Sequence, residues 1–353
     1  MPTPKIDIAK FSDYASRKLI TGQKHPMGEL IIWNYTPIAQ FSRTWDEVTL
    51  TSRGLITDTE GNIKARPFRK FFNYEEHTDP LPNESFVVHE KFDGSLGILY
   101  EQPNGTLAIA TRGSFTSDQA IVGTKILEQH IKEFGTDWIK PGYTYLFEII
   151  YPENRIVVNY GQAQRLVLLA VINTKDGSEL AIEDINYPDK ANMWYNASNL
   201  EELRGTSREN SEGYVIHFEG GLRLKMKHAE YVRLHRLLTQ VSSKSIWELL
   251  KNGQDFTELI ENVPDEFYDW VKDTANKLTN GHDVAMESGR FIAKKIKDLP
   301  TRKDQAAKIA NDPPVLKAIV FALLDGKDSQ AEEIAWKSVK PKYEQPFKED
   351  IDS

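Results

Sequence analysis

The segment HEKFDGSLG, residues 89–97, decides how the rest of this chain is interpreted. Its lysine, Lys91, lies between two acidic residues, Glu90 and Asp93, and is followed by an Asp-Gly pair typical of a turn. The apolar run SLGILY, which begins at Ser95, is typical of a strand. A lysine on the surface requires no such setting, so the segment raises the hypothesis that Lys91 has a chemical role.

Short apolar runs separated by two-residue turn signals extend on both sides of this segment, over residues 28–228. Such a pattern predicts antiparallel hairpins. Four pairs mark the expected turns: Glu60-Gly61, Asn104-Gly105, Asp176-Gly177 and Gly220-Gly221. The continuous apolar run RLVLLAVI, residues 165–172, predicts a strand buried on both faces, and residues 117–134 are the best candidate for a helix.

After about residue 240 the pattern becomes helical. The S-x-x-E sequence of Ser245 and Glu248 has the form of a capping box that opens a helix. Further apolar residues recur at helical spacing: Phe267, Trp270, Val271, Ala275 and Leu278, and then Ile292, Ala293 and Ile296. Pro313-Pro314 and Asp325-Gly326 predict breaks between short helices, with a polar tail after Trp336. The fold class predicted is α+β, with an antiparallel-sheet domain over residues 1–240 and an all-helical domain over residues 241–353.

The composition limits the classes of protein that fit. A chain of 353 residues with 40% hydrophobic residues can bury a large core, and two domains are expected. No cysteine is present, which excludes disulfides, thiol nucleophiles and cysteine-bound zinc. No stretch approaches the ~18 apolar residues of a membrane span, and no signal peptide is visible, so a soluble protein of the cytoplasm is expected. The net charge of −8 argues against binding of nucleic acid through bulk positive charge.

Charged residues recur inside the predicted strands, where an unpaired buried charge is costly. Glu148 lies in the apolar pattern FEIIYP, and Glu212 precedes a glycine and the strand YVIHF. Lys225 and Lys227 are two residues apart, so they share one face of a strand. A polyphosphate with a divalent cation would satisfy charges of both signs. A buried network of lysine and glutamate with only a structural role is the alternative.

Two other kinds of site are disfavoured. The eight histidines show no spacing typical of zinc ligands, and no G-x-x-x-x-G-K-[ST] loop is present. A K-x-D-G sequence alone is also weak, because it is expected by chance in about one chain in ten of this length. The ordered set of charged motifs downstream of Lys91 is therefore what carries the functional prediction.

In their order and spacing, KFDGS, FEIIYP, EGYVI and KMK resemble motifs I, III, IV and V of the covalent nucleotidyltransferases, which include RNA ligases, DNA ligases and capping enzymes. Upstream elements SRGLI and RPFRKFFNYEE narrow the resemblance to the T-even phage RNA ligase 1 family. TRGSF and ENRIVVNY are similar to further segments of that family. The resemblance covers residues 35–236, and the helical C-terminal region is similar to the family's all-helical domain without a shared motif.

This resemblance implies an ATP-dependent RNA ligase that works in three nucleotidyl transfers. A lysine attacks the α-phosphorus of ATP and releases pyrophosphate, AMP then passes to an RNA 5′-phosphate, and a 3′-hydroxyl finally displaces AMP. Lys91 would be the nucleophile. An isolated lysine, with a pKa of about 10.4, is protonated at neutral pH and has no lone pair to attack with, so the site must favour the neutral amine.

The resemblance also implies roles for further residues. Asp93, Glu148 and Glu212 would hold Mg²⁺, or alternatively Mn²⁺, largely through water, and the cation would favour the neutral form of Lys91. The residues expected to bind ATP or AMP are Tyr35, Arg53, Lys70, Glu90, Lys91, Gly94, Arg112, Glu148, Val215, Lys225 and Lys227.

Within that set the resemblance implies distinct contacts. Lys225 and Lys227 would bind the α-phosphate. Arg53 and Lys70 would orient the pyrophosphate, Arg112 the ribose or an RNA 5′-phosphate, and Gly94 would let the backbone approach the nucleotide. The Glu90 backbone would face adenine, with Val215 as an apolar lid. Tyr35 and Phe72 match positions near the nucleotide, and for Phe72 a place in the core is an equal alternative.

The partners implied are RNA 5′-phosphate and 3′-hydroxyl ends, with cleaved tRNA as the natural substrate suggested by phage relatives. A monomer in the cytoplasm of a phage-infected bacterium is expected, without a membrane. Two alternatives remain. One is a DNA ligase or capping guanylyltransferase, against which stand the RPFRKFFN element and the lack of a predicted β-barrel after Lys227. The other is a catalytically silent RNA-binding protein, against which stand the intact charged motifs.

Overall fold

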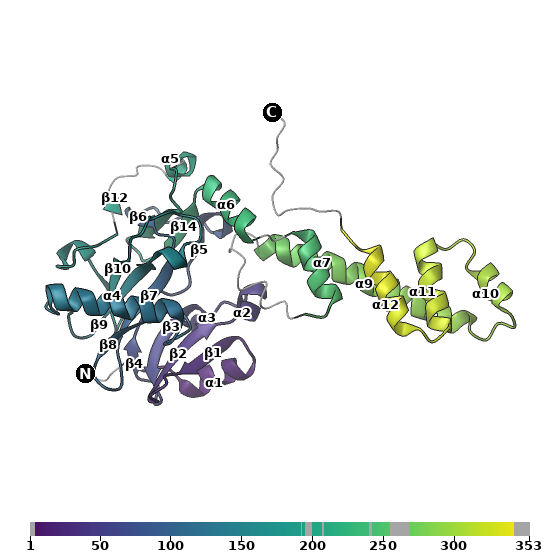
Figure 1. Cartoon of the computed structure of the whole chain (residues 1–353), viewed down its shortest axis with the longest axis horizontal. Coiled ribbons are helices and arrows are strands. Elements are labelled where there is room, and N and C mark those ends of the chain that lie inside the picture. Colours follow the sequence, from purple (N-terminus) through teal and green to yellow (C-terminus); the bar gives the residue numbers. More distant parts are fainter. Residues whose placement is uncertain are drawn as a thin grey trace. The chain divides into compact units, whose positions relative to one another are not determined.

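The computed structural model describes residues 4–191, 193–194, 200–206, 208–239, 242–254 and 268–341. The chain divides into two compact units, Met1–Leu238 and Thr239–Ser353, each described here by itself (Figure 1). The domain boundary predicted between residues 240 and 241 falls outside the described residues. Among the described helices, none combines the length and the apolar character needed to cross a membrane.

Three antiparallel-rich sheets build the first unit. The first sheet follows chain order: β1 (Ile20–Lys24), β2 (Leu30–Tyr35), β3 (Arg53–Asp58) and β4 (Ile63–Ala65). The second has the order β11 (Glu179–Leu180), β10 (Arg165–Asn173), β9 (Tyr143–Ile150), β7 (Ser95–Glu101) and β8 (Leu107–Ala110). The third has the order β12 (Met193–Trp194), β6 (Phe86–Lys91), β13 (Gly213–Phe218), β14 (Arg223–Lys227) and β5 (Phe72–Asn73). The one parallel pair among them joins β14 to β5.

Helices of the first unit are few, as the sequence predicts. They are α1 (Ile8–Ser16), α2 (Pro37–Phe41), α3 (Glu47–Thr51), α4 (Asp118–Phe134), α5 (Leu200–Gly205) and α6 (Ala229–Thr239), with short 3₁₀ turns η1 (Tyr74–Glu76), η2 (Pro152–Asn154) and η3 (Ile182–Asp184). The helix predicted over residues 117–134 is confirmed. Its first residue is preceded by Ser117, whose hydroxyl accepts a hydrogen bond from the backbone N–H of Ala120.

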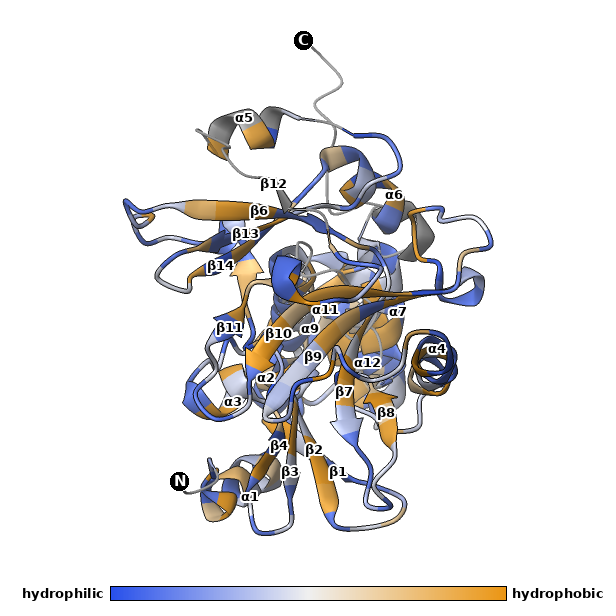
Figure 2. Cartoon of the chain, turned by 90° about the vertical axis from the view of Figure 1, so that its left-hand side faces the viewer, coloured by the Kyte–Doolittle hydropathy of each residue, from blue (hydrophilic) through white to orange (hydrophobic). Residues whose placement is uncertain are grey.

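All four predicted turns join neighbouring antiparallel strands. In each pair the second residue is a glycine with positive φ, between 82° and 93°, a conformation that other residues rarely adopt. The strand predicted at residues 165–172 is confirmed as β10, which is buried along most of its length and carries a bulge between Leu168 and Ala170. Figure 2 shows apolar residues along this strand.

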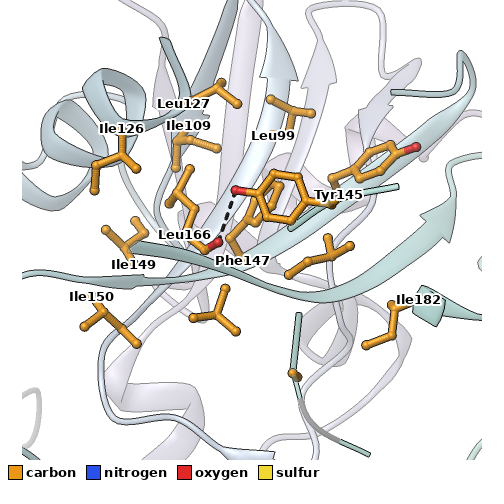
Figure 3. Close-up of a cluster of buried hydrophobic side chains, with 14 of the residues drawn as sticks. Leu99, Ile109, Ile126, Leu127, Tyr145, Phe147, Ile149, Ile150, Leu166 and Ile182 are labelled. Atoms are coloured by element: carbon orange, nitrogen blue, oxygen red, sulfur yellow. Dashed lines mark hydrogen bonds between the residues drawn. The ribbon is translucent and has the colours of Figure 1, made fainter. Parts of the chain in front are cut away.

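The core of the first unit lies on both faces of the second sheet. On one face, residues of α4 pack on the sheet, and Figure 3 shows Ile126 and Leu127 close to Ile109 and Ile149. On the other face, a second apolar cluster joins this sheet to the first sheet: Leu30, Ile32, Ile56, Ile98, Leu146 and Ala170 are among its members. From Tyr145 to Phe147 successive side chains of β9 alternate between the two clusters, and this alternation sets the direction of Glu148.

Helices alone form the described part of the second unit: α7 (Ser243–Lys251), α9 (Tyr268–Ile296), α10 (Arg302–Lys308), α11 (Pro314–Leu324) and α12 (Asp328–Ser338). The predicted breaks at Pro313-Pro314 and Asp325-Gly326 separate α10, α11 and α12. Apolar residues predicted in two groups share the single helix α9, which continues through Gly281 and Gly289, while Phe267 lies outside the described residues.

One helix start differs from the prediction. The capping box is formed by Ser242 and Ser245, not by Ser245 and Glu248. The Ser242 hydroxyl accepts from the N–H of Ser245, and the Ser245 hydroxyl accepts from the N–H of Ser242 at 2.9 Å. These two hydrogen bonds make Ser242 the N-cap residue, so α7 begins at Ser243.

Candidate active site

Lys91 is the last residue of β6, and strand pairing places it opposite Gly213, the first residue of β13. Glu212 immediately precedes that glycine. The Lys91 Nζ lies 2.7 Å from Oε2 of Glu212, whose side chain is 4% exposed against 21% for the lysine. A buried carboxylate thus holds the lysine amine in place.

The same carboxylate contacts a second lysine. Gly213 also pairs with Lys227 on β14, and Lys227 Nζ lies 3.4 Å from Oε1 of Glu212. Two residues further along the strands, Val215 pairs with Lys225. Paired residues share a face, so Lys91, Val215, Lys225 and Lys227 point to one side of the third sheet, as the two-residue spacing of the lysines predicts.

Gly213 allows this arrangement. Its φ is +147°, and a Cβ built on it would lie 2.1 Å from the carbonyl oxygen of Met226 and 2.7 Å from Cα of Lys227. No larger side chain fits between the two strands without displacing backbone. The glycine after Glu212 therefore brings the strand that carries Lys227 close enough for one glutamate to contact both lysines.

Glu148 reaches the site from β9 of the second sheet. Its Oε1 accepts a hydrogen bond of 3.0 Å from the N–H of Gly94, three residues after Lys91. Burial raises the pKa of the Glu148 carboxyl to about 8, and the negative charges of Glu212 and Asp93 act in the same direction, while Lys91 opposes them. Glu148 is therefore largely protonated at neutral pH in the protein alone.

Gly94 lies against the neighbouring strand β9. A Cβ at this position would lie 2.5 Å from the carbonyl oxygen of Ile149 and 3.1 Å from Cγ of Glu148. The absent side chain thus lets the turn after Lys91 approach β9. The close approach between this backbone and a nucleotide stays a prediction.

The raised pKa of Glu148 leads to a stability prediction. An unfolded glutamate titrates near 4.5, so between about pH 4.5 and 8 the folded protein binds more protons than the unfolded chain, and stability falls as pH rises through that window. Glu148→Gln removes this contribution. Relative to the wild type, the variant should gain melting temperature as pH increases from 5 to 8.5, without metal or nucleotide.

Calorimetry of both proteins at several pH values measures this difference. Glu230→Gln is the matched control, because Arg233 holds the pKa of the exposed Glu230 below its usual range and no titration is expected between pH 5 and 8.5. A difference between Glu148→Gln and the wild type that is constant with pH, or that falls, would contradict the half-buried, protonated Glu148.

Asp93 is held by the protein itself. Its Oδ2 accepts hydrogen bonds from the N–H groups of Val157 and Val158, at 2.8 and 2.7 Å, and its Oδ1 accepts from the hydroxyl of Tyr231 at 2.8 Å. Its own N–H donates to the hydroxyl oxygen of Tyr160. Both carboxylate oxygens of Asp93 accept hydrogen bonds from the protein, and only 3% of the residue is exposed. These surroundings favour a structural role for Asp93 over the predicted role in holding a metal ion.

The remaining acidic groups, Glu148 and Glu212, would hold a divalent cation through its water molecules and not by direct contact. Among the residues that the structure describes, no three His, Asp or Glu side chains converge to bind a metal ion directly. In their ionised forms Glu148 and Glu212 would repel each other, and the charge of Glu212 adds to the burial that raises the pKa of Glu148. A hydrated cation near both carboxylates would relieve this repulsion, and Mg²⁺ keeps several of its waters in protein sites.

The predicted upstream residues form a second cluster. Lys70 is buried, and its Nζ lies over the rings of Tyr35, Trp45 and Phe72, 5.4–5.6 Å from each ring centre. The exposed Arg112 donates to the hydroxyl of Tyr35 at 3.2 Å. Residues separated by up to 77 positions in the chain are thus brought together here.

The ring of Phe71 lies close to two more of the cationic residues that were predicted to bind ATP. The Arg53 guanidinium lies 5.4 Å from the centre of the Phe71 ring, and Lys225 Nζ lies 5.9 Å from it.

Glu90 pairs with Tyr214 and not with the residues that face Lys91, so its side chain points to the opposite side of the third sheet. Only its backbone can then take part on the Lys91 side, in keeping with the prediction.

The sequence interpretation missed a group on the same face as Lys91. Arg223 forms a two-bond ion pair with Glu179 of β11, at 2.8 and 2.9 Å, and its guanidinium also lies 3.1 Å from Nδ1 of His217. His89 lies near Arg223. Burial, followed by the positive charge of Arg223, lowers the pKa of His89 to about 4, so His89 is neutral at neutral pH. Alternation in RLKMK was a usable signal, because Arg223 shares the face of Lys225 and Lys227.

Two tyrosines were also missed. Tyr160 lies within the quoted segment ENRIVVNY, and Tyr231 follows Lys227 by four residues. No local pattern reveals that both hydroxyls hydrogen-bond to Asp93, which is 67 and 138 positions away.

Comparison with known proteins places these motifs in a family. A family model described as RNA ligase, of the T4 RNA ligase 1 type, matches residues 51–231, just over half of the chain. The RNA ligase of Rhodothermus phage RM378 is 23% identical over 393 aligned positions, which cover 86% of each chain. RNA ligase 1 of bacteriophage TS2126 is 28% identical and covers 53% of this chain and 52% of its own.

Other relatives are matched only in part. A protein of Autographa californica nuclear polyhedrosis virus, provisionally named a bifunctional polynucleotide kinase/RNA ligase, is 25% identical. The match covers 71% of this chain and 40% of that protein, and a Thermovibrio ammonificans relative is covered over 59% of its length. Among solved structures, an archaeal ATP-dependent RNA ligase aligns with 91% of this chain and 78% of its own, at 10% identity and a TM-score of 0.45, which supports no conclusion by itself.

Proposed function

The chain belongs to the RNA ligase family of the T4 RNA ligase 1 type, and on that premise we propose that it is an ATP-dependent RNA ligase. The observation that carries the proposal is the contact of one buried glutamate, Glu212, with both Lys91 and Lys227. The reaction proposed joins an RNA 5′-phosphate to a 3′-hydroxyl through a lysyl-AMP intermediate and an adenylylated RNA end.

Lys91 is the nucleophile in this proposal. Its neutral amine attacks the α-phosphorus of ATP, a P–N bond forms, and the bond to pyrophosphate breaks. Glu212 Oε2, at 2.7 Å from Nζ, is placed to accept the proton that the amine gives up. When bound, a hydrated Mg²⁺ or Mn²⁺ would offset the negative charge of Glu148, Glu212 and the α-phosphate.

The other cations bind phosphate in this proposal. Lys225 and Lys227 share the face of Lys91, which supports contact with the α-phosphate. Arg53, Lys70 and Arg112 belong to the aromatic-lined cluster and are proposed to bind the pyrophosphate or an RNA 5′-phosphate. Tyr35 and Phe72 would shape that cluster, while Val215 would cover adenine, whose edge faces the backbone of Glu90.

RNA is the proposed partner, and cleaved tRNA its natural form. The second unit, with basic residues in and after α9, is proposed to select the RNA: Lys294, Lys295, Lys297, Arg302 and Lys303. A monomer acting in the cytoplasm of a phage-infected bacterium is proposed on the same basis, since phage proteins are among the relatives.

One experiment tests the proposed activity. The protein is incubated with Mg²⁺ and ATP or GTP labelled at the α-phosphate, and the alkali-stable label that remains on the denatured protein is measured. RNA or DNA with a 5′-phosphate is then added, and joined product is followed. Label from ATP with joining of RNA is expected. Label from GTP, or joining of DNA in preference, would point to a capping enzyme or a DNA ligase, and no label at all to a silent RNA-binding protein.

A further inference from the structure

The helix that follows Lys227 contacts the turn that carries Lys91. In α6, the hydroxyl of Tyr231 donates a hydrogen bond of 2.8 Å to Oδ1 of Asp93, and both residues are buried, at 4% and 3% exposure. We propose that Tyr231 is a positioning residue, whose hydroxyl acts through Asp93 to hold Lys91 where it can attack ATP. This inference rests on the proposed function, because it concerns the same nucleophile.

Asp93 connects its own turn to two other segments of the first unit, residues 157–160 and α6. Its Oδ2 accepts from the N–H groups of Val157 and Val158, and its own N–H donates to the hydroxyl of Tyr160. Tyr231 adds the bond from α6 to the other carboxylate oxygen. Without that hydroxyl, Oδ1 would lose a donor in a buried place, and the carboxylate is expected to turn toward another partner.

A turned Asp93 would move the nucleophile, since only one residue separates it from Lys91. The same turn is fixed at its other end, where the N–H of Gly94 donates to Glu148. Lys91 must also stay within reach of Glu212, 2.7 Å away. A misplacement of about 1 Å between reacting atoms is enough to cost about 10²-fold in rate.

Tyr231 contacts the phosphate-binding side of the site as well. Lys227 Nζ lies 5.4 Å from the centre of the Tyr231 ring. A single side chain therefore touches both the turn of the proposed nucleophile and one of the lysines proposed to bind the α-phosphate. That double contact distinguishes Tyr231 from a tyrosine that only fills the core.

Tyr145 provides the matched comparison. It is fully buried in the same unit, its hydroxyl donates to the carbonyl of Trp138 at 2.6 Å, and it lies in the cluster between the second sheet and α4. Tyr231→Phe and Tyr145→Phe each remove one buried hydroxyl and nothing else. Both are expected to lower the melting temperature, but only Tyr231→Phe should slow the attack of Lys91.

Single-turnover labelling of the protein with ATP tests the proposal well below both melting temperatures. Tyr231→Phe is expected to lower the maximal rate of lysine adenylylation about 10- to 100-fold, with the half-saturating ATP concentration changed less than about threefold. Tyr145→Phe should label at the wild-type rate. Equal rates for Tyr231→Phe and wild type, or an equal fall in both variants, would overturn the positioning role.

A second measurement uses RNA that already carries AMP on its 5′-phosphate. Sealing of this RNA does not need Lys91 as a nucleophile, so Tyr231→Phe should seal it within about threefold of the wild-type rate. A loss as large as that in lysine adenylylation would overturn the proposal, because the hydroxyl would then support the whole site. If the wild type itself neither labels nor seals, the proposed function fails instead, and the two failures are distinguishable.

Discussion

Lys91→Arg should be as inactive in lysine adenylylation as Lys91→Ala, a loss of at least about 10⁴-fold. A guanidinium has a pKa above 12, so only about 10⁻⁵ of it is neutral near pH 7.5, and a protonated nitrogen cannot attack phosphorus. The substitution keeps the positive charge opposite Glu212, to which Lys91 Nζ lies at 2.7 Å. It therefore separates nucleophilicity from charge.

Mass spectrometry after incubation with ATP and Mg²⁺ measures the result, as a phosphoramidate on residue 91 that is present in the wild type and absent from Lys91→Arg and Lys91→Ala. Lys64→Arg is the matched control, because Lys64 lies on the surface and pairs with Asp58 at 3.3 Å. That control should label normally. Substantial labelling of Lys91→Arg would refute Lys91 as the nucleophile.

Glu212→Gln should lower the rate of lysine adenylylation by about 10²- to 10⁴-fold, the range typical of a lost general acid or base. The amide has nearly the shape of the carboxylate, but it cannot accept a proton from Lys91 and no longer compensates two ammonium groups. Removing one partner of a fully buried ion pair costs about 3–5 kcal/mol of stability, and the partial exposure of Lys91 and Lys227 should reduce that cost.

The matched control is Asp189→Asn, which breaks the two-bond pair between Asp189 and Arg165 in the same unit. It should lower stability without affecting labelling by ATP. Labelling is compared with melting temperature for both variants across a magnesium titration. Wild-type labelling of Glu212→Gln at every magnesium concentration would exclude both the proton-accepting and the metal-holding parts proposed for this residue.

Local features of the fold follow from the sequence. The turn pairs at Glu60-Gly61, Asn104-Gly105, Asp176-Gly177 and Gly220-Gly221 all connect antiparallel strands, because a glycine with positive φ is a requirement of the turn itself. The helix that begins after Ser117 likewise follows from a cap within one turn of its start. Such signals are readable in a few consecutive residues and do not depend on distant partners.

Prediction failed where several local solutions were equally good. Ser242, Ser245 and Glu248 offer two overlapping capping boxes, and the structure uses the earlier one. Gly94 shows a second limit of the sequence. The sequence identifies a position without a side chain, but only the fold shows that the carbonyl of Ile149 occupies the space beside it.

By itself, the sequence determined four hairpin turns, the strand at residues 165–172, the helix at residues 117–134, and the order in which the charged motifs follow Lys91. The tertiary structure decided which of these charges meet: Glu212 contacts Lys91 and Lys227, whereas Asp93 is bonded to Tyr231 and the backbone of residues 157–158. The physical reason is range. Turn and strand preferences act between neighbours in the chain, but a buried carboxylate takes its partners from segments that only the packing of the sheets brings within hydrogen-bonding distance.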